Sequence, residues 1–134
     1  MMVARLDKLK RIAAVQAKLH RIEEFRLAEI QRRSAELARE EETLVATFND
    51  DDTFAGVFVA AMARQLRRIA QESTRVETSK ATQAGVVRDA ALRLKRTERH
   101  ADRMAQSVRR DDERRLLREL IEALGTPRDD ASPV

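Results

Sequence analysis

The stretch Phe48-Asn49-Asp50-Asp51-Asp52-Thr53-Phe54 decides how this chain folds. Asn and Asp side chains compete with helical hydrogen bonds, and they therefore favour turns and helix caps. Asp51, Asp52 or Thr53 can accept hydrogen bonds from the free N–H groups that begin a following helix. An aspartate charge also suits the positive end of that helix. We therefore predict a turn at residues 50–53, and the sequence contains no second internal turn signal of comparable strength.

The composition favours helix on both sides of this turn. The chain has 134 residues, of which 3% are aromatic, with three Gly and two Pro. Buried strands favour aromatic and β-branched residues, so this content argues against a β-sandwich or barrel. Both prolines, Pro127 and Pro133, lie in the last eight residues, so no proline breaks a helix before them. A chain rich in Ala, Arg, Glu and Leu is typical of long helices and coiled coils.

The segment before the turn is predicted to be one helix over about residues 3–49. Its apolar residues recur mostly at spacings of three, four or seven, as one helix face requires. The step from Ile22 to Leu27 is five residues, which predicts a slip in the heptad pattern. The apolar positions are Leu6, Leu9, Ile12, Val15, Leu19, Ile22, Leu27, Ile30, Leu37, Leu44 and Phe48.

The segment after the turn is predicted to be a longer helix over about residues 54–124. Alternating steps of four and three run from Ala55 to Val108 without a slip, which indicates a coiled-coil seam. Gly125 and Pro127 predict the helix end at residue 124 and a flexible tail over 126–134. The seam positions are Ala55, Val59, Met62, Leu66, Ile69, Ser73, Val76, Lys80, Gln83, Val87, Ala90, Leu94, Thr97, Ala101, Met104 and Val108.

Together these elements predict an all-α fold, an antiparallel two-helix coiled-coil hairpin in one domain over residues 1–125. A fold point near residue 51 makes the numbers of facing residues add to about 102–103. This register pairs Leu37 with Leu66 and places Glu23 opposite Lys80. Because the first helix begins near residue 3, residues 101–124 should overhang by roughly 36 Å at 1.5 Å per residue.

The predicted overhang carries a compact apolar stripe bordered by arginines. Such a stripe left in water usually marks an interaction site. Docking on a partner, self-association of two hairpins and a short fold-back all remain open. The predicted partner-binding residues are Arg110, Arg114, Arg115, Leu116, Leu117, Arg118, Leu120, Ile121 and Leu124.

The sequence offers no catalytic, cofactor-binding or metal-binding set, and we expect a non-enzymatic protein. His20 and His100 lie far apart along the predicted hairpin, and no serine has an evident histidine base. No glycine loop that could cradle phosphate occurs. The acidic residues Asp50–Asp52 lack the alternating ligand positions of a calcium loop.

The distribution of charged and apolar residues argues against nucleic-acid binding and against membrane insertion. There are 27 Lys+Arg and 23 Asp+Glu, a net charge of +4. Arginines on the second helix could contact phosphates, but acidic residues are interspersed and no Phe lies among them to stack on bases. No apolar run approaches the ~18 residues that a membrane span needs. The absence of Cys fits a cytoplasmic protein.

The chain resembles the small coiled-coil stalk proteins of type III export systems, the flagellar FliJ family and its YscO-type injectisome counterparts. The resemblance lies in overall size, the opening Leu6-Asp7-Lys8-Leu9-Lys10-Arg11-Ile12, the long Arg/Ala/Glu/Leu helices, the single short turn and the longer second helix. The resemblance is one of overall pattern, and it extends over nearly the whole chain.

This resemblance implies a cytoplasmic, non-enzymatic stalk or adaptor. In that family the joined helical termini insert into the hexameric export ATPase, and the hairpin connects it to the export gate. Two alternatives remain open beside it. One is a generic coiled-coil scaffold or homodimeric interaction protein, and the other is a basic nucleic-acid-associated helical protein.

Overall fold

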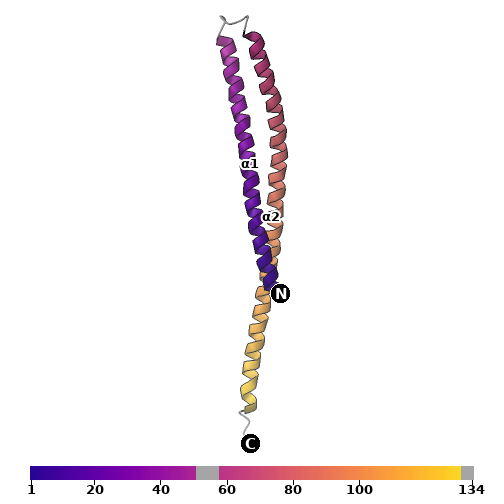
Figure 1. Ribbon diagram of the computed structural model, residues 1–134. Helices are drawn as coiled ribbons and strands as arrows, with labels where there is room; N and C mark the ends of the chain where they lie inside the picture. The colour runs from indigo at the N-terminus through magenta and orange to yellow at the C-terminus, as the bar shows by residue number, and fades with distance from the viewer. Residues whose placement is uncertain (51–57, 131–134) are drawn as a thin grey trace. The chain divides into compact units, whose positions relative to one another are not determined.

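The computed structural model describes residues 1–50 and 58–130, and these are helical apart from Met1 and Phe58. Helix α1 spans Met2–Asp50 and helix α2 spans Val59–Asp130 (Figure 1). The two helices pack against each other. The predicted all-α fold of two long helices, the second longer than the first, is therefore confirmed.

The chain divides into two compact units, and each contains part of both helices. We call Ala17–Leu92 the internal unit, and Met1–Gln16 with Arg93–Val134 the terminal unit. Within each unit, a length of α1 lies beside a length of α2 that runs in the opposite direction (Figure 1).

The predicted seam of the second helix is confirmed in the internal unit from Met62 onwards, whereas Val59 is 38% exposed and Ala55 lies outside the described residues. Ile69 is 4% exposed and lies in the same core as Leu37 of α1, which is 1% exposed. Steps of three and four residues return to one side of a helix, so the intervening seam positions also turn towards α1. The positions that are buried or half-buried are Met62, Leu66, Ile69, Ser73, Val76, Lys80, Gln83, Val87 and Ala90.

The seam of α1 differs from the prediction. In the internal unit, Leu19 and Ile22 are 51% and 48% exposed, whereas the neighbouring His20 and Glu23 are half-buried. The packed series advances by three and four residues without interruption and reaches Leu27, so the predicted slip after Ile22 is wrong. The residues of α1 that pack against α2 are those at uninterrupted spacings of three and four along the helix, even though some of them are polar.

In the terminal unit, α1 also packs with the face that includes polar residues, and its more apolar face is exposed. Ile12 and Val15 are 39% and 57% exposed, while Ala13 and Gln16 are half-buried. The buried end of this series is Leu6, at 8% exposure. The apolar residues at 12, 15, 19 and 22 therefore lie beside the α1 seam and do not form it.

Polar contacts join the two helices in the middle of the internal unit. Arg33 donates to Glu72 Oε1 from Nη2 at 2.6 Å and from Nε at 2.9 Å, and its Nη1 reaches Glu36 at 3.2 Å. The hydrogen bond to Glu72, followed by that to Glu36, raises the pKa of the Arg33 guanidinium above its ordinary value. Gln83 Nε2 donates to the Glu23 carboxylate at 2.6 Å and to the Glu23 carbonyl oxygen at 2.9 Å.

These contacts correct the predicted register. The numbers of the facing residues add to 105 for Arg33–Glu72 and to 106 for Glu23–Gln83, compared with the predicted 102–103. Glu23 consequently meets Gln83 and not Lys80. The reason is the length of the connection, because residues 51–58 separate the helices and the fold point lies later than the predicted four-residue turn.

The start of α2 also lies later than predicted. The Met62 N–H donates to the Phe58 carbonyl at 2.8 Å, so Phe58 is the N-cap and the helix begins at Val59 instead of residue 54. The predicted capping residues Asp51–Thr53 lie outside the described residues.

The end of α2 lies beyond the predicted stop at residue 124. The helix continues to Asp130, so the predicted flexible tail is helical from 126 to 130, and 131–134 lie outside the described residues. Gly125 has no positive φ, which means that it does not form the left-handed cap that would end a helix there.

We expect Leu37→Ala to lower the free energy of unfolding by about 2–5 kcal/mol, because it empties the most deeply buried position of the internal unit. Urea unfolding followed by circular dichroism measures the change. Leu19→Ala is the matched control, since this leucine is 51% exposed. Equal losses in the two variants would contradict the packing described for α1.

We expect the double variant Glu23→Leu with Gln83→Leu to be more stable than the wild type by about 1 kcal/mol or more, because apolar residues at a polar seam position avoid the desolvation of a carboxylate. Gln83→Leu alone should stabilise less, since it leaves Glu23 without its partner on α2. Thermal unfolding of the three chains tests this order. A double variant that melts below the wild type would show that the polar contact contributes net stability.

Candidate functional site

The terminal unit pairs the beginning of α1 with the second half of α2. Leu6 and Ala101 are each 8% exposed and form its buried core. On α2 the half-buried residues Leu94, Thr97, Met104 and Val108 continue the predicted steps of three and four. The coiled-coil seam of the second helix is therefore confirmed in this unit as well.

The pairing ends near residue 115 of α2. Met1, Met2 and Val3 line a groove of about 290 Å³ together with Val108, Asp111, Asp112 and Arg115. The predicted overhang from residue 101 is therefore wrong, since Ala101 is buried and α1 covers α2 about four helical turns further. The later register, together with the start of α1 at Met2, accounts for the difference.

Beyond this groove α2 continues without a covering helix. Figure 1 shows it extending past the N-terminus of the chain. The five predicted apolar residues lie here and are all exposed, and we call them the apolar stripe. They are Leu116 at 59%, Leu117 at 59%, Leu120 at 60%, Ile121 at 61% and Leu124 at 73%.

The apolar stripe does not continue the seam that faces α1. Steps of three and four from Val108 reach Asp111, Arg115 and Arg118, which are all charged. At 3.6 residues per turn, the centre of the stripe lies roughly 150° around α2 from the seam. A partner can therefore bury the stripe without separating α1 from α2. Continuing the steps of three and four beyond Val108 in the sequence is enough to predict that the stripe lies outside the seam.

The predicted arginines are exposed, but they do not surround the stripe evenly. Helical spacing places Arg114 and Arg118 along one edge of the stripe and Arg110 before its first leucine. Arg115 lies on the seam side, where it lines the groove with the N-terminal residues. The nearest ion pair, Arg114 Nη1 to Asp111 Oδ1, is long at 4.0 Å. The guanidinium groups of the edge therefore remain accessible to a partner.

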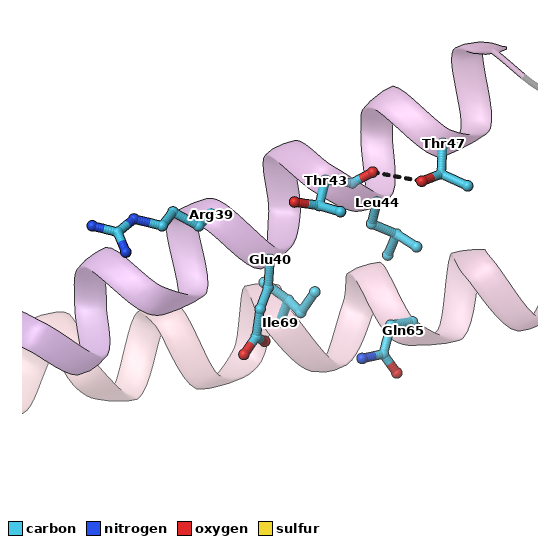
Figure 2. A pocket seen from close by; sticks show the side chains of 7 residues that line it. All are labelled: Arg39, Glu40, Thr43, Leu44, Thr47, Gln65 and Ile69. Atoms are coloured by element: carbon cyan, nitrogen blue, oxygen red, sulfur yellow. Dashed lines mark hydrogen bonds between the residues drawn. The ribbon is translucent and has the colours of Figure 1, made fainter.

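A groove between the helices of the internal unit is the other recess we considered (Figure 2). Its volume is about 360 Å³, and Leu44 of α1 and Ile69 of α2 form its apolar floor. The Thr47 hydroxyl on its rim donates to the Thr43 carbonyl at 2.8 Å, as Figure 2 shows. Its other lining residues are Arg39, Glu40, Thr43, Thr47 and Gln65. These side chains do not present a nucleophile beside a base.

The two histidines occupy different units. His20 Nδ1 lies 2.9 Å from Glu24 Oε1 one helical turn away, and His100 is exposed on α2. Over residues 1–50 and 58–130, no group of three or more His, Cys, Asp or Glu side chains is placed to hold a metal ion. Within the same residues, neither helix has a stretch long and apolar enough to cross a bilayer.

Comparison of the chain with protein-family models, curated proteins and solved structures gave no match. Its function is therefore inferred from the surface of α2 and from the contacts around it.

We expect the triple variant Leu116→Ala, Leu120→Ala and Leu124→Ala to change the free energy of unfolding by no more than about 0.5 kcal/mol, because these side chains contact solvent. Leu6→Ala in the same terminal unit should cost about 2 kcal/mol or more. Urea unfolding compares the two. A large loss in the triple variant would mean that the stripe already packs against its own chain.

Proposed function

We propose that this protein is a non-enzymatic coiled-coil adaptor that docks the end of α2 on a protein partner. The observation that carries the proposal is the apolar stripe, five large side chains that are 59–73% exposed beyond the end of α1. Complete burial of such a side chain is worth about 1.5–3 kcal/mol, so a partner groove that covers several of them gains useful affinity. An amphipathic helix in a groove is a common mode of peptide recognition.

The partner we propose is the hexameric ATPase of a flagellar or type III secretion export apparatus, with an export-gate component as a second contact. The chain's resemblance to FliJ and YscO-type stalk proteins suggests this assignment, together with a cytoplasmic location. Two features of the terminal unit support it. The first residues of α1 lie beside α2, and α2 extends beyond them as a free amphipathic end. A complementary socket would be apolar, with carboxylates facing Arg114 and Arg118.

A homodimeric scaffold is the second candidate, and the exposed edge of α1 favours it. In the internal unit Leu19 and Ile22 point away from the seam although polar neighbours occupy it. Val86 of α2 precedes the seam residue Val87 by one position, and it is 39% exposed. In an antiparallel pair, residues one position before the seam on each helix share one side of the pair, so Val86 can extend the same apolar surface.

Truncation of the chain after Arg115 tests the adaptor proposal. We expect full-length protein to retain the purified export ATPase in a pull-down and the truncated protein to lose it, because the truncation removes the whole apolar stripe. The full-length variant Leu117→Asp with Leu120→Asp should also lose binding, since it places charge in the proposed contact.

The matched control is Val45→Asp with Phe48→Asp, which changes two exposed apolar residues of α1 in the internal unit. This variant should bind the ATPase as the wild type does. Undiminished binding by the truncated chain would exclude the end of α2 as the docking site. Light scattering on the wild type addresses the second candidate, because a monomer at high concentration argues against a homodimer.

A further inference from the structure

The charges of this chain are divided unevenly between its two units. The internal unit has 12 Lys+Arg and 13 Asp+Glu, and is close to neutral. Residues 1–16 and 93–115, the paired part of the terminal unit, have 13 Lys+Arg and six Asp+Glu. A general arginine bias would affect both units alike, so this local excess of cations needs its own explanation.

Four of these cations form a row along α2. Arg96, Arg99, Arg103 and Arg110 each follow a seam residue by two positions. Two positions correspond to about 200° around a helix, so the row lies on the side of α2 that faces away from α1. It extends over roughly 21 Å at 1.5 Å per residue. We call these four residues the arginine ridge.

The ridge is exposed and unneutralised. All four side chains are exposed, and among the described residues none of them forms an ion pair. The nearby acids Glu98, Asp102 and Glu113 lie roughly 130°, 90° and 70° away around the helix. The acidic residues that are interspersed in the sequence therefore lie beside the ridge and not between its arginines.

We propose that the arginine ridge binds the phosphate backbone of double-stranded nucleic acid without reading its sequence. Arg guanidinium groups bind phosphate oxygens through two parallel hydrogen bonds. Phosphate contacts of this kind supply most of the affinity of non-specific binding. This activity goes beyond the adaptor function and does not depend on it.

The surroundings of the ridge favour a nucleic acid over an acidic protein. Protein interfaces obtain most of their affinity from a few apolar or aromatic anchors, and this face has no apolar residue between Leu92 and the apolar stripe. Nucleic-acid interfaces are more polar and more positively charged. All four phenylalanines belong to the internal unit, so the terminal unit lacks the aromatic platforms that single strands stack on. A duplex needs no such platform.

The test is fluorescence anisotropy with a random-sequence DNA duplex of about 20 bp at several salt concentrations. We expect the full-length wild type to bind, with an affinity that falls as salt rises. The variant Arg96→Gln, Arg99→Gln, Arg103→Gln and Arg110→Gln should bind about tenfold more weakly or worse. Its slope of log affinity against log salt should be smaller by up to about 3.6, since each phosphate contact contributes about 0.9.

The matched control is Arg32→Gln, Arg64→Gln, Arg68→Gln and Arg75→Gln, four exposed arginines of the internal unit. It removes the same charge and should retain near-wild-type affinity and salt slope. Circular dichroism verifies that both variants remain helical. An equal loss of duplex affinity in the two variants would mean that only the net charge of the protein matters, and it would overturn the proposal that the ridge is a binding site.

Three further outcomes would overturn the proposal. One is the absence of duplex binding by the wild type at about 0.1 M salt. Another is tighter binding of a single strand of the same length than of the duplex. The third is competition by poly-glutamate as effective as that by unlabelled duplex at equal charge, which would identify an acidic protein as the better partner.

Discussion

The structure depends on a coiled-coil seam that is narrow, because each helix has only one neighbour. Leu37 and Ile69 in the internal unit and Leu6 and Ala101 in the terminal unit are the buried apolar residues among those the structure describes. Two helices cannot enclose more than a line of side chains, so most apolar residues away from that line remain in contact with water. The narrow seam thus explains both the modest core and the large amount of surface available to partners.

A seam of this kind leaves the register to be set by a few specific contacts. Arg33 with Glu72 and Glu23 with Gln83 are hydrogen-bonded pairs that few alternative alignments would reproduce. Polar residues at seam positions generally fix register at some cost in stability. The Glu23–Gln83 pair lies on the face of α1 that packs, whereas Leu19 and Ile22 lie beside that face and are exposed.

The side of α2 that faces away from α1 changes character along the terminal unit. Between Arg96 and Arg110 it presents unneutralised guanidinium groups, and from Leu116 to Leu124 it presents the apolar stripe. Both surfaces are available while the helices stay paired. Phosphate binding needs dispersed cations, whereas protein docking needs apolar anchors, so the two surfaces suit partners of different chemistry.

The two helices, the seam of α2 and its exposed apolar end can be predicted from the amino-acid sequence, because the uninterrupted steps of three and four from Met62 to Val108 admit one helix face. The sequence did not determine which face of α1 packs. The series through Ile12 and Ile22 contains more apolar residues over that part of the helix. The series through Gln16 and Glu23 is the one that packs, because it keeps its spacing along the paired length of α1. The register was likewise decided by tertiary structure, because it depends on the length of the connection and on contacts such as Arg33–Glu72 between residues far apart in the chain. Identifying the arginine ridge needs both the sequence and the structure. The sequence places the arginines two positions after the seam, and the packing of α1 shows that their side of α2 is free.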